Sequence, residues 1–219
     1  MPAWLTRIIP DPRAHEVRRD HGSATGMHRR IMSLFPEHAG PDPRARFHVL
    51  YRTEDSPTGS QLLIQSSERP DLAKLPAGYG QSASKPLDAL LDALRPGLTV
   101  QYRCVASPVR KPGRTTRALY DLPAAVPLSG AAADEWWVRQ AAAAGLQPQT
   151  VSSRPLDTAL VQRAASGPGT PQRFQHARTQ FDGTATIVDA DELRTKLLDG
   201  IGRGKAYGCG LLTIAPPRR

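Results

Sequence analysis

Strand and helix signals follow one another along the first half of this chain in an order that few folds accommodate. The apolar run Ala3–Ile9 predicts a strand that ends at a proline. Ser23 or Thr25 can cap a helix, whose apolar face carries Met27, Ile31, Leu34 and Phe35. Two strands, a second helix and a fourth strand are expected next, over residues 46–52, 61–66, 84–97 and 98–106. The order β-α-β-β-α-β predicts a ferredoxin-like unit.

The second half repeats this order less clearly. Ala132–Gly145 predicts a helix, and a strand is expected near residues 149–153. Residues 174–188 alternate around Asp182-Gly183, which predicts a hairpin turn. A helix with an Asp189 cap is expected to end at Gly200, before a closing strand over residues 208–215. The predicted fold class is α+β, with two tandem ferredoxin-like (RRM-like) βαββαβ domains over residues 1–106 and 107–219.

The charge of the chain is strongly positive and uneven. The formal net charge is +9, which favours an anionic partner such as nucleic acid. Residues 1–98 carry 13 basic and 11 acidic side chains, net +2, whereas residues 99–219 carry 16 and 9, net +7. The second half is therefore expected to carry most of the positive surface that contacts the anionic partner.

The sequence disfavours membrane proteins, secreted proteins and metal-binding proteins. No apolar run reaches the roughly 20 residues that a membrane helix needs, and the N-terminus lacks the pattern of a signal peptide. Cys104 and Cys209 stand alone, as expected of buried thiols in a reducing cytoplasm. The six histidines and two cysteines lack metal-ligand spacing. We expect a cytoplasmic protein without a metal, a cofactor or a membrane partner.

The segment GIGRGKAYGCGLL, residues 200–212, holds five glycines and two cations. It could be a nucleotide-phosphate cradle, a loop with no binding role, or a platform for another anion. The order helix, glycines, strand is the reverse of a dinucleotide-binding fold, and Ala206 stands where a Walker A loop needs a hydroxyl. A helix cap explains Gly200 but not the other four glycines. Bare backbone beside Arg203 and Lys205 favours a platform for a polyanion.

This glycine-rich segment resembles the C-terminal signature of the CRISPR-associated CasE family, the repeat-processing endoribonuclease of the type I-E Cascade complex. Four other stretches agree in the same order: MHRRIMSLFP, QYRCVASPVRK, DEWWVRQAAAAG and FDGTATIVDADEL. The resemblance covers most of the chain. It implies two ferredoxin-like domains that bind the stem-loop of a CRISPR repeat RNA, in both pre-crRNA and crRNA.

The resemblance also implies an activity. Members cut once at the 3′ base of the stem-loop without metal, by attack of a 2′-hydroxyl on the phosphate. The product keeps the stem-loop, and the protein stays on it beside the other Cascade subunits. In this chain His28 matches the catalytic histidine, and imidazole suits proton transfer near neutral pH.

The second proton carrier is an open question. Family members often carry a tyrosine three residues before the histidine, where this chain has Thr25. His21, another tyrosine or water could serve, or His28 could act with cations alone. Arg29 is a candidate contact to the scissile phosphate.

Other basic residues and the glycines beside them are candidates for RNA contact. The glycine-rich segment contributes Gly202, Arg203, Gly204 and Lys205, and the basic loops and strands elsewhere contribute Arg110, Lys111, Arg114, Arg117, Arg163, Arg173 and Arg178. Two hypotheses other than the endoribonuclease remain, a non-catalytic subunit that binds an RNA stem-loop and a DNA-binding tandem domain.

Overall fold

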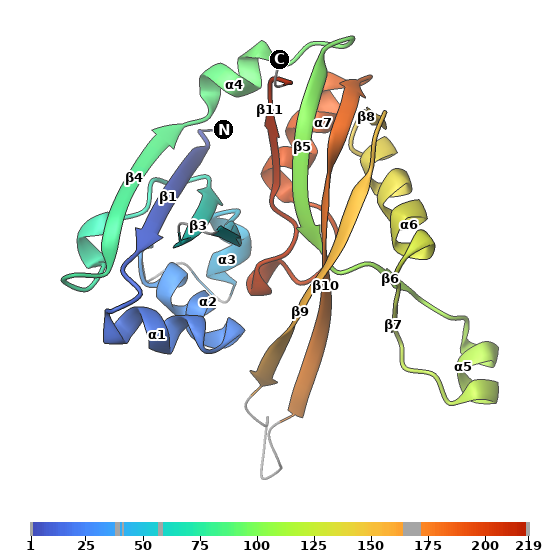
Figure 1. Ribbon diagram of the computed structural model, residues 1–219, viewed down its shortest axis with the longest axis horizontal. Coiled ribbons are helices and arrows are strands. Elements are labelled where there is room, and N and C mark those ends of the chain that lie inside the picture. The colour runs from blue at the N-terminus through green and yellow to red at the C-terminus, as the bar shows by residue number, and fades with distance from the viewer. Residues whose placement is uncertain (1, 38–39, 41, 57–58, 164–171, 218–219) are drawn as a thin grey trace.

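The computed structural model describes residues 2–37, 40, 42–56, 59–163 and 172–217, and gives the backbone alone for 157–163 and 172–176. In this part of the chain, most strands belong to two antiparallel sheets that lie side by side, one built from each half of the chain (Figure 1). Across the same ranges, every helix is too short or too polar to span a bilayer.

The first sheet has the strand order β2-β3-β1-β4, which is the order of a ferredoxin-like unit. Every pair in it is antiparallel. Its strands are β1 (Trp4–Pro10), β2 (Leu50–Ser56), β3 (Gly59–Ser66) and β4 (Gly80–Pro86). The accompanying helices are α1 (His15–His21), α2 (Ala24–Met32), α3 (Pro43–Arg46) and the short 3-10 helix η1 (Leu72–Lys74).

The predicted helix around His28 is confirmed as α2. Its cap is Ser23, whose hydroxyl accepts a hydrogen bond from the Gly26 N–H at 2.9 Å. The expected apolar face is buried, and it packs against the first sheet with Ile8, Leu62 and Ile64. This packing fixes which side of α2 faces away from the first core, and His28 lies on that side.

The fourth strand of the first unit differs from the prediction. Residues 99–106 pair with β10 and β11 in the second sheet, so their assignment to the first sheet is wrong. The fourth place is taken by β4, whose polar, exposed sequence GQSASKP carries no apolar pattern. The second helix, α4 (Asp88–Ala93), follows β4, and Leu91 and Leu94 pack in the core of the second unit. The chain therefore passes from the first sheet to the second between Pro86 and Thr99, and the division into two domains stays a prediction.

The second sheet repeats the same order, β11-β5-β10-β8, with β9 paired to β10. Helices α6 and α7 lie on one face of this sheet (Figure 1), where Trp137 stacks on Phe181 at 4.9 Å. The strands are β5 (Thr99–Ala106), β8 (Leu146–Pro148), β9 (Ser152–Arg163), β10 (Gln172–Ile187) and β11 (Leu212–Ala215). The helices are α6 (Ala131–Ala142) and α7 (Ala190–Asp199), the latter capped by Asp189 as predicted.

The predicted turn at Asp182-Gly183 is wrong, because β10 runs straight through it. Asp182 accepts hydrogen bonds from Arg103 on β5 and from Gln180. A Cβ atom on Gly183 would lie 2.0 Å from the Thr150 carbonyl oxygen, so the glycine permits a close backbone approach instead of a turn. The hairpin is formed by β9 and β10.

The basic segment between the units contains a short excursion from the two sheets. Strands β6 (Val109–Arg110) and β7 (Val126–Pro127) pair with each other. Between them, α5 (Arg114–Tyr120) projects away from both sheets (Figure 1).

The two units are joined by a buried arginine. Arg52 of β2 is 2% exposed, and all five of its guanidinium N–H groups find acceptors. Two of them bond the Arg103 and Leu211 carbonyl oxygens at 3.1 and 2.9 Å, across to the second unit. The others bond the carboxylate of Glu54 and the hydroxyl of Thr213. Burial alone would raise the pKa of Glu54, but Arg52, helped by Gln61 and Arg103, holds it below its usual value.

We expect Arg52→Met to lower the free energy of unfolding by about 3 kcal/mol, because it strands buried carbonyl oxygens and a buried carboxylate. Chemical denaturation measures the change. Arg18→Met, at an exposed position on α1, is the matched control and should change stability by less than about 0.5 kcal/mol. An Arg52 variant as stable as this control would contradict the role of the buried guanidinium.

Candidate active site

Helix α2 of the first unit meets the glycine-rich segment of the second. His28 faces Tyr207 on the short 3-10 helix η2 (Lys205–Tyr207), with 6.4 Å between the ring centroids and a tilt of 58°. Tyr51 precedes Arg52 at the seam, which is the contact between the two units. Its hydroxyl donates to the Ala206 carbonyl oxygen at 3.1 Å. His28 and the glycine-rich segment therefore share one site, although they lie at opposite ends of the sequence.

The glycines serve the path of this loop. All five between residues 200 and 210 have φ between 73° and 92°, a region that side chains disfavour. Gly204 and Gly208 bracket η2 in the left-handed conformation. A helix cap explains Gly200 alone, whereas the positive φ angles favour glycine at every one of these positions.

The surroundings of His28 favour the neutral imidazole. Partial burial lowers its pKa, and the nearby Arg44 guanidinium lowers it further, while Asp42 acts in the opposite direction. A neutral imidazole at neutral pH can accept a proton. His28 is thus placed to act as a base.

Lys205 and Arg44 form a cluster of positive charge near His28. The Lys205 ammonium donates to the Asp199 carbonyl oxygen at 2.6 Å, at the C-terminal end of α7, where a cation is favourable. Burial lowers the pKa of Lys205, Arg44 and Lys196 lower it further, and Asp199 opposes them. Arg44 therefore acts on both His28 and Lys205.

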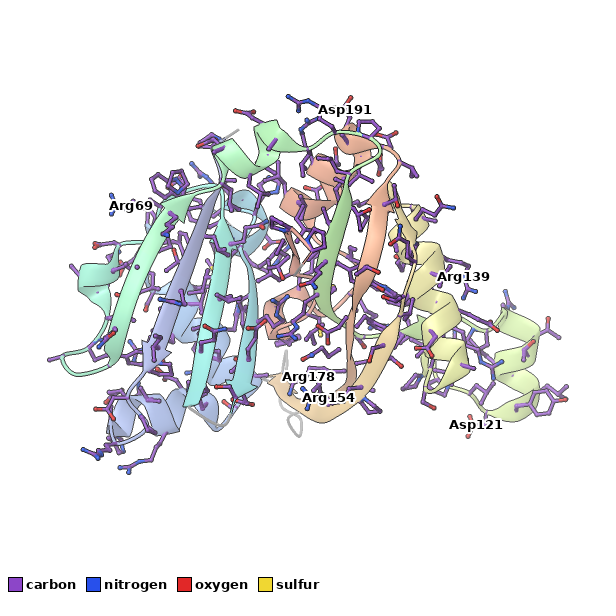
Figure 2. The ribbon with its side chains drawn as sticks, turned by 45° about the horizontal axis from the view of Figure 1, so that its top comes forward. Arg69, Asp121, Arg139, Arg154, Arg178 and Asp191 are labelled. Carbon is purple, nitrogen blue, oxygen red and sulfur yellow. The ribbon has the colours of Figure 1, made fainter. Side chains whose placement is uncertain are left out.

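A cleft of about 560 Å³ opens between the two units beside this cluster. Ala24 lines it, and His28 lies one helical turn further along the same face of α2. The opposite wall includes Arg154 and Arg178, which are diagonal neighbours on one face of the β9-β10 ladder. Figure 2 shows both arginines at the same end of the molecule, between the two halves. The cleft also receives Tyr207 from the glycine-rich segment.

The predicted site residues divide into those at this cleft and those elsewhere. Arg178 adjoins the glycine-rich segment, since a Cβ atom built on Gly208 would lie 3.8 Å from its Nη1. Gly202 and Arg203 are exposed on the loop, Gly204 and Lys205 are half-buried, and Arg29 is exposed beside His28. Thr25 lies on α2, but its hydroxyl is enclosed and has no hydrogen-bond partner among the described residues.

The remaining predicted RNA contacts lie away from His28. Arg110, Lys111, Arg114 and Arg117 belong to the β6-α5 excursion. Arg163 and Arg173 lie at the far end of the β9-β10 ladder, next to the segment 164–171, and their side chains fall outside the described residues.

Sequence analysis missed Tyr207, Arg44 and Arg154. Tyr207 has a signal in hindsight, because it is the aromatic residue inside the glycine-rich segment. Arg154 lies near the start of β9, which begins at Ser152, just beyond the strand expected near residues 149–153. Arg44 lies on α3, a one-turn helix that no periodic pattern predicts.

Among the described residues, this site holds neither a cluster of metal-ligating side chains nor an exposed thiol. Within the described ranges, no three His, Cys, Asp or Glu side chains gather closely enough to hold a metal ion. Cys104 and Cys209 are buried and unpaired, and burial raises the pKa of each thiol to about 12.

Comparison with known proteins identifies related chains. A family model described as "CRISPR associated protein" matches residues 3–216. The CRISPR-associated endoribonuclease Cse3 of Thermus thermophilus is 29% identical over 222 residues, covering 97% of this chain and 100% of that protein. The CRISPR system Cascade subunit CasE of Escherichia coli is 27% identical over 203 residues, covering 87% and 90%. The structure of Thermus thermophilus Cse3 bound to an RNA representing a pre-cleavage complex matches with a TM-score of 0.79 and 25% identity, covering 99% and 100%.

We expect His28 to titrate below the ordinary histidine value of about 6.5. Arg44→Gln should raise its pKa, and the matched change Asp42→Asn should lower it. NMR titration of the imidazole signals, assigned with a His28→Gln variant, measures both shifts. Because the folded pKa is the lower one, the neutral ring contributes stability above about pH 6.5 that is lost as the pH falls. A pKa at or above 6.5 would contradict the described surroundings.

Proposed function

Because the chain belongs to the family of CRISPR-associated proteins that includes Cse3 and CasE, we propose that it is an endoribonuclease that processes pre-crRNA. The observation that carries this proposal is the meeting of His28 with a cationic glycine-rich loop beside an arginine-lined cleft. The relative that carries the name endoribonuclease matches along the whole length of that protein, and its structure with RNA shares the fold.

The proposed reaction is a single cut at the 3′ base of the repeat stem-loop. The 2′-hydroxyl before the cut attacks the phosphorus, His28 accepts its proton, and no metal ion takes part. The products are a cyclic 2′,3′-phosphate, or the 3′-phosphate derived from it, and a 5′-hydroxyl. Arg178, Lys205 and Arg29 are the cations available to offset the charge that develops on the phosphate.

The proposed contacts with RNA extend beyond the cut. Arg203 and the backbone of the glycine-rich segment would hold phosphates next to the reaction centre. The basic residues of the α5 excursion, and Arg163 and Arg173 on the β9-β10 hairpin, are proposed to contact the stem. We further propose that the protein stays on its product among the other Cascade subunits, as the name of the CasE relative suggests, and that it acts in the cytoplasm.

His28→Ala should slow cleavage by about 10²–10⁴-fold and leave RNA binding nearly unchanged, because a proton acceptor is lost while the cations remain. The test incubates purified protein with its genome's own repeat RNA in EDTA and follows labelled fragments on a gel. His15→Ala, at an exposed histidine on α1, serves as the control variant. A His28 variant that cuts at the wild-type rate would disprove the catalytic role of this residue.

The same assay separates the remaining hypotheses. Intact RNA that stays bound to the wild-type protein would favour a non-catalytic stem-loop-binding subunit. An RNA with a 2′-deoxy nucleotide before the cut should resist cleavage, and normal cleavage of that RNA would exclude 2′-hydroxyl attack. Preferential binding of duplex DNA over repeat RNA would favour the DNA-binding hypothesis.

Arg203→Gln should weaken RNA binding and reduce the slope of log affinity against log salt by about one, because one phosphate contact is lost. Fluorescence anisotropy over a salt series measures this slope. Arg139→Gln removes the same charge from the exposed side of α6, far from the cleft (Figure 2), and is the matched control. Equal slopes for the two variants would show that the loop cation makes no phosphate contact.

A further inference from the structure

Attack by a 2′-hydroxyl moves two protons, one from the attacking oxygen and one to the departing 5′-oxygen. The surroundings of His28 favour the neutral ring, which suits the first transfer and leaves the second without a donor. This inference rests on the proposed function and concerns the residue that supplies the second proton.

Tyr207 is near the imidazole of His28 and also lines the cleft. Its ring faces that of His28 at 6.4 Å, and the same side chain lines the cleft together with Arg154 and Arg178. A phosphate held by these arginines would lie beside Tyr207, and His28 is the neighbour of Tyr207. The phenol of Tyr207 has a hydroxyl group that can donate a proton.

The backbone holds Tyr207 in this position. The Tyr207 N–H donates to the Gly204 carbonyl oxygen at 2.8 Å, and the Cys209 N–H donates to the same oxygen at 3.3 Å. The Tyr51 hydroxyl fixes the neighbouring Ala206 from the side of the first unit. The ring is thus carried on a turn that is anchored to both units.

The other hydroxyl groups that could serve are placed differently. Tyr51, Tyr79 and Tyr102 are buried, each at most 3% exposed, whereas Tyr207 is half-buried at the cleft. Tyr120 belongs to the projecting helix α5, and the Thr25 hydroxyl is enclosed. Two further proton donors, Lys205 and His21, remain as competitors near the site, and the test includes both.

We propose that the phenol of Tyr207 is the catalytic acid. As the O2′–P bond forms and the P–O5′ bond breaks, His28 takes the proton of the 2′-hydroxyl and Tyr207 gives its own to the 5′-oxygen. The products are the cyclic phosphate and the 5′-hydroxyl. Proton transfer from the imidazolium to the phenolate, directly or through water, restores the enzyme.

A substrate with sulfur in place of the bridging 5′-oxygen tests this role, because a thiolate leaves without needing a proton. Tyr207→Phe should slow cleavage of ordinary repeat RNA by about 10²-fold or more, and should cut the 5′-thio RNA at nearly the wild-type rate. His28→Ala should be slow on both substrates, because the attacking hydroxyl still has to lose its proton. Single-turnover rates with excess protein give these comparisons.

Control variants separate an acid from a structural role. Tyr120→Phe removes an exposed hydroxyl from α5 and should cut both substrates normally. Tyr51→Phe loosens the loop and should slow both substrates alike. Thermal unfolding of each variant confirms that it is folded.

Four results would overturn the inference. Tyr207→Phe could be slow on both substrates, which would make the phenol a positioning group, or it could cut both at the wild-type rate. The thio substrate could instead rescue Lys205→Ala or His21→Gln, which would assign the acid elsewhere. Failure of the wild-type protein to cut either substrate would overturn the proposed function itself, and this inference with it.

Discussion

The buried guanidinium of Arg52 is the interaction on which the site depends. It reaches from β2 of the first unit to the carbonyl oxygens of Arg103 and Leu211, and it leaves none of its donors unsatisfied. Such a group tolerates little displacement, because a shift would strand buried polar atoms on both sides of the seam. The preceding residue in the chain, Tyr51, extends the same seam to the glycine-rich loop. The alignment of the two units therefore fixes the position of that loop against α2, and so of Tyr207 against His28.

A site divided between two units gathers positive charge that neither holds alone. Arg44 of the first unit lowers the pKa of both His28 and Lys205, in addition to the effect of burial, so the cations repel one another in the free protein. A phosphate placed among them would offset this repulsion, which makes the site most favourable when a polyanion occupies it. Burial, helped by Arg44, favours the neutral imidazole of His28 before binding. Arg44 thus contributes both to anion recognition and to a proton-accepting imidazole.

Local signals in the sequence were sufficient for the fold class, for the apolar residues on the inner face of α2, and for limiting the cap of α2 to Ser23 or Thr25, of which the structure has Ser23. They failed where long-range contacts decide. Strand β4 has a polar sequence and is held by pairing with β1, while Asp182-Gly183 has the composition of a turn but is kept extended by Arg103 and the close approach of Thr150. In the site, His28 and the glycine-rich loop could be identified by resemblance. Arg44 could not, because its one-turn helix carries no periodic pattern. Tyr207 is visible in the sequence as the aromatic residue of the glycine-rich segment, but its place beside His28 arises from the docking of the two units.

The central claim is that this docking brings His28 and the glycine-rich loop to a single phosphate. A crystal structure of the protein with repeat RNA that carries a 2′-deoxy nucleotide before the cut would test it most directly. The account predicts the scissile phosphate in the cleft, within reach of both the imidazole of His28 and the hydroxyl of Tyr207, with the guanidinium of Arg178 within contact distance. A scissile phosphate bound outside the cleft, or one that touches residues of a single unit only, would contradict it.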